Sequence, residues 1–127
     1  MRIKAYRKGY TGERELVHKL YEKGYMVLRS PRSGRISLPS PDLIAIKKGK
    51  IYVIECKSRK NGFKIYDNQI KQLKEWVEKA NTKAFIAWKI TRKGWRFIPL
   101  EEIIKNEGNV GKDFCNKVGL DFETAFD

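Results

Sequence analysis

The sequence predicts an α/β protein in which helices flank a mixed β-sheet, with the element order α-β-β-β-α-β-β. Residues 11–23 and 67–80 carry apolar side chains at helical spacing, whereas shorter runs between and after them are rich in β-branched and aromatic residues. A Lys-Lys-Gly-Lys turn joins two of these runs, as expected for an antiparallel hairpin. The 127 residues are enough for one domain with its own core.

The predicted first helix carries an acid on its apolar face. Leu16 and Leu20 begin a stripe at helical spacing, and Gly24 is expected to end the helix. Glu13 lies on the same stripe one turn earlier, where an apolar residue would be expected. The alternative is an acid in a frayed first turn, where the helix dipole favours negative charge. Residues 1–9 before this helix are expected to form a basic arm.

The predicted hairpin, with strands over 43–46 and 51–54, is the central element. Asp42 opens its first strand, and Glu55 and Lys57 close the second. In a hairpin the start of one strand lies beside the end of the other, so Asp42 is expected to approach Glu55. Because side chains alternate across a strand, Glu55 and Lys57 share one face. The three side chains are therefore predicted to converge.

This convergence leaves a deficit of positive charge, because two acids meet one Lys beside apolar strands. Buried carboxylates are costly unless something neutralises them. A hard divalent cation that prefers oxygen ligands, Mg²⁺ or Mn²⁺, would do so. The alternative is a surface hairpin that ends in a solvated Glu/Lys pair.

The remaining elements follow in order. A short strand is expected over 25–29, and a loop rich in Pro, Gly and Ser follows it to Pro41. Asp67 is the expected N-cap of the second helix, which comes after a basic, flexible connection. Strands are predicted over 83–89 and 95–100, before a helical turn. The structure of the tail, residues 106–127, is left open.

The composition favours a partner that is a polyanion. Lys and Arg number 28 against 15 Asp and Glu, which gives a net charge of +13 and a pI near 9.8. Nucleic acid is the commonest such partner, and an acidic membrane surface is the rival. No apolar run spans a membrane and no signal peptide is apparent, so we expect a cytoplasmic, nucleoid-associated protein without membrane contact. Two Cys and one His exclude a disulfide framework and a four-ligand zinc site.

These motifs resemble the PD-(D/E)xK nuclease superfamily, in Pro41-Asp42 and Glu55-Cys56-Lys57. More closely, roughly residues 6–100 are similar to the archaeal Holliday junction resolvases, through further motifs in matching order and spacing: Lys8-Gly9, Glu13-Arg14-Glu15-Leu16, Val27-Leu28-Arg29-Ser30 and Gly94-Trp95-Arg96-Phe97-Ile98. The resemblance implies a restriction-endonuclease-like fold. It also implies a homodimer that binds four-way DNA junctions and makes paired symmetric nicks with Mg²⁺, for which Mn²⁺ substitutes.

The same resemblance implies roles for individual residues. Glu13, Asp42 and Glu55 would hold the metal with the Cys56 carbonyl, and Lys57 would orient the attacking water. Ser30 would lie in a mobile loop beside the site. Basic and polar residues are candidates for DNA contact: Arg7, Lys8, Arg14, Arg29, Arg32, Arg35, Arg59, Lys60 and Gln69.

Two aromatic residues of the last predicted strand, Trp95 and Phe97, are candidates for the dimer contact, together with the apolar residues of the tail; core packing is the alternative for the two aromatics. Other functions also remain open. Another PD-(D/E)xK nuclease of repair or restriction type would share every catalytic residue. A non-catalytic DNA-binding module, or a ribosomal or RNA-binding protein, would explain the charge but would have no use for the acids.

Overall fold

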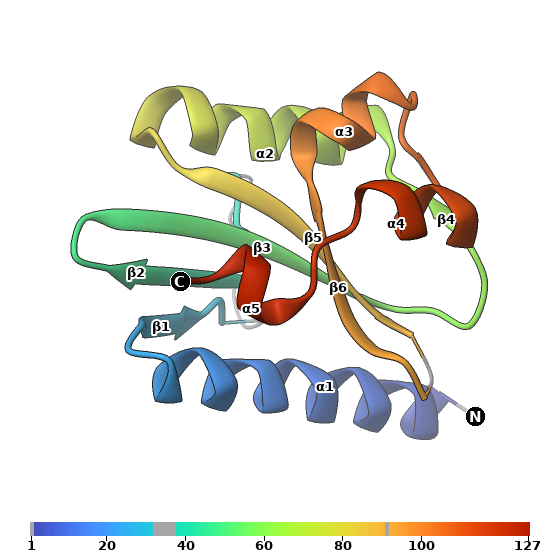
Figure 1. Ribbon diagram of the computed structural model, residues 1–127, viewed down its shortest axis with the longest axis horizontal. Coiled ribbons are helices and arrows are strands. Elements are labelled where there is room, and N and C mark those ends of the chain that lie inside the picture. Colours follow the sequence, from blue (N-terminus) through green and yellow to red (C-terminus); the bar gives the residue numbers. More distant parts are fainter. Residues whose placement is uncertain (1, 32–37, 91) are drawn as a thin grey trace.

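A five-stranded mixed sheet with the strand order β1-β2-β3-β5-β6 forms the centre of the molecule, and helices α1 and α2 lie on its opposite sides (Figure 1). The computed structural model describes residues 2–31, 38–90 and 92–127, with side chains from residue 12 onward. The elements are α1 (Arg2–Glu22), β1 (Met26–Arg29), β2 (Leu43–Lys47), β3 (Lys50–Ser58), β4 (Phe63–Lys64), α2 (Asp67–Ala80), β5 (Lys83–Ile90), β6 (Gly94–Pro99), α3 (Leu100–Lys105), β7 (Asn109–Val110), α4 (Lys112–Val118) and α5 (Phe122–Ala125).

The predicted hairpin is confirmed as β2 and β3, which pair antiparallel with Leu43 opposite Ile54. Its turn places Lys48 at φ 47° and Gly49 at φ 85°. Two successive residues with positive φ match the twist of the flanking strands, and Gly adopts this conformation without steric cost. The turn therefore fixes the register, and with it the alignment of the strand ends that carry the acids.

Helix α2 connects β3 to β5, which run parallel with Glu55 opposite Ile86. A parallel pair needs such a crossover, and here it brings α2 over the face of the sheet that carries Glu55. Asp67 was expected to cap the helix, but Tyr66 occupies the N-cap position without a side-chain cap, and Asp67 is the first helical residue. Asn81, in the left-handed conformation at φ 54°, ends the helix.

Alternation along the strands divides the core between the two faces of the sheet. On one face, Leu16 and Leu20 of α1 pack against Tyr52 and Ile54 of β3. On the other face, Leu73 of α2 packs with residues of β5, β6 and α3. Helix α1 begins at Arg2, well before the expected start near residue 11, so the backbone of the expected basic arm belongs to this helix.

The C-terminal segment, whose structure was left open, completes the α1 side of the core. Phe126 is fully buried, and its ring lies 5.0 Å from that of Phe97 and 5.1 Å from that of Tyr52. The Lys47 ammonium donates to the Asp127 carbonyl at 2.8 Å. The end of the described chain is thereby joined to the turn of the β2–β3 hairpin, as the position of the C-terminus in Figure 1 illustrates.

The expectation that Trp95 and Phe97 contact a second subunit is wrong. Trp95 is 5% exposed and Phe97 is fully buried, and both belong to the core between α1 and the sheet. The alternative of core packing is therefore confirmed for both. The helices described in residues 2–31, 38–90 and 92–127 include none that is long and apolar enough to cross a membrane.

Candidate active site

Two carboxylates meet at the end of the hairpin opposite its turn. The backbone N–H of Asp42 donates to Oε1 of Glu55 at 3.0 Å, and the backbone N–H of Cys56 donates to Oδ2 of Asp42 at 2.8 Å. Each acid is thus held by the strand that carries the other. This reciprocal pair of hydrogen bonds confirms the prediction that Asp42 and Glu55 converge.

Helix α2 holds the second oxygen of Glu55. The side-chain amide of Gln69, in the first turn of α2, donates to Oε2 of Glu55. Gln69 was predicted to contact DNA, but in the structure its side-chain amide binds the carboxylate of Glu55. The signal available in the sequence was its position beside the apolar stripe of α2, four residues before the buried Leu73.

The electrostatics of the pair favour a positive partner. The pKa of Glu55 is raised from 4.5 to about 7, first because burial removes water from its carboxylate and then because the Asp42 carboxylate lies beside it. The Asp42 N–H and the Lys57 ammonium act in the opposite direction without cancelling the rise. The described side chains therefore leave the negative charge at this site only partly compensated.

Because its pKa is raised, Glu55 should make the free energy of unfolding of the metal-free protein depend on pH. The carboxyl holds its proton more tightly in the folded protein than in the unfolded one. The contribution of Glu55 to the free energy of unfolding is therefore fully present below pH 4.5 and is lost as the pH rises through about 7. The effect should be on the order of 3 kcal/mol, so Glu55→Gln should be the more stable protein at pH 8 by about that amount.

Urea unfolding of wild type and Glu55→Gln in EDTA, at pH 4 and at pH 8, measures this contribution as the difference between the two proteins. Glu78→Gln on the exposed face of α2 is the matched control and should follow the wild type. If wild type and Glu55→Gln lost the same stability between the two pH values, the raised pKa would be refuted.

Glu13 lies on the apolar stripe of α1 as predicted, and it is 7% exposed. Arg29, at the end of β1, places its Nε 3.2 Å from Oε1 of Glu13. The structure does not gather Glu13 with the other two acids: the side chains described from residue 12 onward contain no group of three His, Cys, Asp or Glu close enough to hold a metal ion. The physical reason is that Glu13 approaches from the α1 side, whereas Glu55 faces Gln69 on the α2 side.

Ser30, directly after β1, is hydrogen-bonded to the residues that lead into β2. Its backbone N–H donates to the Asp42 carbonyl at 2.9 Å, and its hydroxyl donates to the Pro41 carbonyl. The Ser40 hydroxyl lies 3.3 Å from that of Ser30. Ser30 therefore lies beside Asp42, as the resemblance implied.

Lys57 lies two residues after Glu55 on the same face of β3 and is partly buried. Cys56, between them, turns its side chain to the opposite face, where it packs against the core on the α1 side. The expected division of the strand is thus confirmed, with the two charged groups on one face and the thiol on the other. The site is a pair of carboxylates with one ammonium nearby.

A family model described as archaeal Holliday junction resolvase (Hjc) matches residues 4–127. The chain belongs to this family. It is 42% identical over 121 residues to the crossover junction endodeoxyribonuclease Hjc of Sulfolobus acidocaldarius, a match that covers 91% of this chain and 84% of the relative. To the Hjc of Sulfurisphaera tokodaii it is 38% identical over 104 residues, with 80% and 72% covered. The solved structure of Archaeoglobus fulgidus Hjc, a Holliday junction resolvase, superposes with a TM-score of 0.82 at 26% identity, covering 92% of this chain and 98% of that one.

The expected restriction-endonuclease-like arrangement, a mixed sheet flanked by helices, is confirmed by this match to an Hjc structure. The basic residues of this Hjc family member that were predicted to contact DNA include three with exposed side chains. Arg14, Arg59 and Lys60 are exposed. Arg32 and Arg35 lie outside the described residues, as do the side chains of two residues whose backbone belongs to α1, Arg7 and Lys8.

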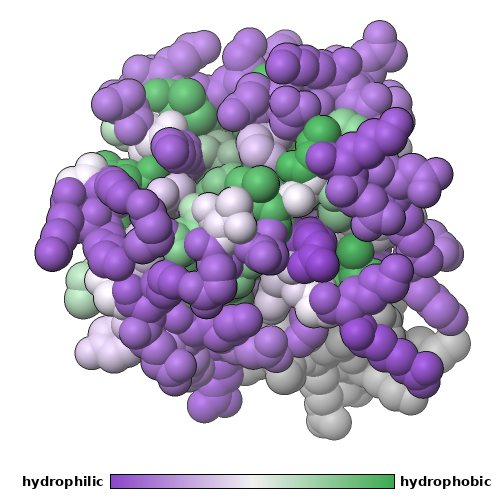
Figure 2. Space-filling view, viewed as in Figure 1, coloured by the Kyte–Doolittle hydropathy of each residue, from purple (hydrophilic) through white to green (hydrophobic). Residues whose placement is uncertain are grey.

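Hydrophilic side chains cover most of the face of the molecule drawn in Figure 2, with hydrophobic residues in smaller areas between them. The net charge of the whole chain, +13, attracts phosphate over a distance longer than any single contact. The match to the Holliday junction resolvase family supports the prediction that the polyanionic partner is a nucleic acid.

Proposed function

We propose that this protein resolves four-way DNA junctions by paired symmetric hydrolysis of phosphodiester bonds, with Asp42 and Glu55 at its catalytic centre. The observation that carries the proposal is the reciprocal hydrogen bonding that holds these two acids together, next to Lys57, in a chain of the Holliday junction resolvase family. The net charge of +13 supports a DNA substrate.

The donor set fits a hard divalent cation. Asp42 and Glu55 offer oxygen ligands, and the raised pKa of Glu55 indicates that a positive charge beside its carboxylate would be favourable. We propose that these two residues hold Mg²⁺, or Mn²⁺ in its place, with the Cys56 carbonyl. In the structure Glu13 pairs with Arg29. Its proposed role as a further metal ligand therefore rests on the family resemblance alone. When bound, the metal would supply a water that is nucleophilic near neutral pH and would neutralise the leaving oxygen.

The chain's own groups have separate tasks in this proposal. Gln69 fixes the orientation of the Glu55 carboxylate through its amide. Lys57 carries a compact positive charge that orients water and offsets charge on the phosphate. Arg14, Arg59 and Lys60 bind the DNA backbone. The affinity for DNA should therefore fall as salt is added. A plot of log K against log salt concentration should have a slope of about −0.9 for each phosphate neutralised on duplex arms.

A homodimer is part of the proposal, because one cut leaves a four-way junction unresolved. The junction has two-fold symmetry, and a two-fold dimer would present two copies of the acid pair to opposite strands. Light scattering of the purified protein, alone and with junction DNA, measures the number of subunits.

The experiment that tests the function compares substrates that share arm sequences. End-labelled four-way, flap and linear duplex DNA are incubated with the protein, with and without Mg²⁺. We expect two nicks at symmetric positions in opposite strands of the junction, dependent on Mg²⁺, and little cutting of the duplex. Equal cutting of flap or duplex in competition with the junction would favour a different PD-(D/E)xK nuclease. Binding without any cutting would favour a non-catalytic DNA-binding module.

A further inference from the structure

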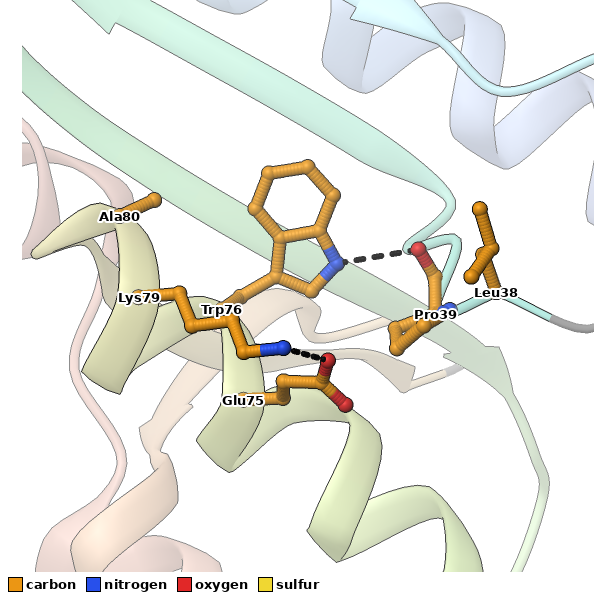
Figure 3. A pocket seen from close by; sticks show the side chains of 6 residues that line it. All are labelled: Leu38, Pro39, Glu75, Trp76, Lys79 and Ala80. Atoms are coloured by element: carbon orange, nitrogen blue, oxygen red, sulfur yellow. Dashed lines mark hydrogen bonds and ion pairs between the residues drawn. The ribbon is translucent and has the colours of Figure 1, made fainter.

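Helix α2 contacts both segments that carry the acid pair. Gln69 reaches Glu55 at the end of β3. Seven residues further along, on the same side of the helix, the indole N–H of Trp76 donates to the Pro39 carbonyl at 3.2 Å (Figure 3). Pro39 lies three residues before Asp42, so one helix fixes Glu55 directly and holds the backbone that leads into Asp42.

Trp76 and Ser30 both bind carbonyl groups of the segment from Pro39 to Asp42. Proline has no N–H, so Pro39 and Pro41 offer only a carbonyl to the rest of the protein. Trp76 binds the first of these carbonyls, and Ser30 binds the carbonyls of Pro41 and Asp42. The α2 side is thus anchored by Trp76 and the β1 side by Ser30.

The surroundings of Trp76 make its hydrogen bond important for the position of the ring. The indole is only partly buried, and a hollow of about 270 Å³ lies beside it, with Leu38, Pro39 and Ala80 in its wall. The Glu75–Lys79 ion pair, at 2.8 Å, lies on the same hollow (Figure 3). The ring also packs against the core on the α2 side, so among the described residues the N–H bond to Pro39 is its directional contact.

We infer that Trp76 is a positioning residue for the cleavage reaction: its indole N–H anchors Pro39 and so keeps Asp42 in register with Glu55. The inference rests on the proposed function for its effect on cleavage. Its structural part does not, because the hydrogen bonds between the two acids and the facing strands exist independently of any reaction.

Trp76→Phe tests this assignment, since phenylalanine keeps a six-membered aromatic ring in α2 and removes the N–H donor with the rest of the indole; unchanged exchange at Leu73 would show that the lost packing does not loosen the helix itself. The first measurement is amide hydrogen exchange by NMR. The amides of Asp42 and Cys56, which donate to the acid pair, should exchange about tenfold faster in the variant, because their hydrogen bonds open more often. The amide of Leu73, in the middle of α2, should be unchanged.

The second measurement is single-turnover cleavage at saturating protein. The rate should fall about tenfold while the Kd for junction DNA stays within about twofold, because Trp76 acts on the acids and not on the DNA. Lys79→Gln is the matched control: it removes the ion pair on the same hollow and leaves the indole bond, so both measurements should match the wild type.

Unchanged exchange at Asp42 and Cys56 in Trp76→Phe would overturn the inference, and so would equal effects of Lys79→Gln. If exchange rises as expected but the wild type cuts no junction, the positioning of Asp42 by Trp76 is supported and the proposed function fails. The two failures are therefore distinguishable.

Discussion

Asp42→Asn should lower the rate of junction cleavage by about 1000-fold and leave junction affinity within about twofold. Asparagine has nearly the same shape as aspartate, and its carbonyl oxygen can still accept from the Cys56 N–H. The substitution removes the negative charge that the proposed metal requires. DNA binding should survive, because it depends on basic residues spread over the surface.

Single-turnover cleavage and equilibrium binding, measured on the same junction, test this prediction. Asp67→Asn, an exposed acid at the start of α2, is the control and should cleave like the wild type. Mg²⁺ should raise the Tm of the wild type at pH 8, because it relieves the repulsion between Asp42 and Glu55, and should not raise that of Asp42→Asn. Substantial cleavage by Asp42→Asn would exclude Asp42 from the catalytic centre.

Phe126→Ala should destabilise the protein by about 4 kcal/mol, although this residue lies in a segment whose structure the sequence left open. Its ring is fully buried and lies within 5.7 Å, between centroids, of the rings of Tyr25, Tyr52, Phe85 and Phe97. Removal of the ring would leave a cavity that the surrounding aromatic side chains cannot fill without moving off their preferred rotamers.

Urea unfolding in EDTA at pH 5 measures this loss without any contribution from metal. Phe122→Ala provides the comparison, since Phe122 is only partly buried and should cost clearly less. Junction cleavage by Phe126→Ala at a temperature where it remains folded should be close to that of the wild type, because the ring lies on the α1 side of the sheet. A loss of less than about 1 kcal/mol would show that the C-terminal segment is dispensable for the fold.

The hairpin and its acid pair could be predicted because the information is local. Both strands, the turn and the two carboxylates lie within a short stretch, and alternation along a strand determines which side chains share a face. The partner of Glu55 on α2 could not be predicted in this way. Gln69 reaches the site only because β3 and β5 run parallel, and a parallel pairing leaves no signal in a turn.

The position of Glu13 shows a different limit. Its burial followed correctly from the helical stripe, but periodicity gives the face of a helix and not the direction in which a long side chain extends. The structure turns Glu13 toward Arg29. The C-terminal segment had weak periodicity, and Phe126 is ordered by contacts with residues about 100 positions earlier, such as Tyr25. Such contacts depend on the completed sheet and have no local pattern.

The contrast between the antiparallel hairpin and the parallel β3–β5 pairing also bears on the order of folding events. A hairpin closes a short loop and forms within microseconds, whereas the parallel pairing must wait for the crossover through α2 to close. We therefore expect Asp42 and Glu55 to come together early in refolding, before α2 is in place to hold Glu55 through Gln69. The acid pair should become rigid last, when α2 docks on the sheet and Gln69 binds Glu55.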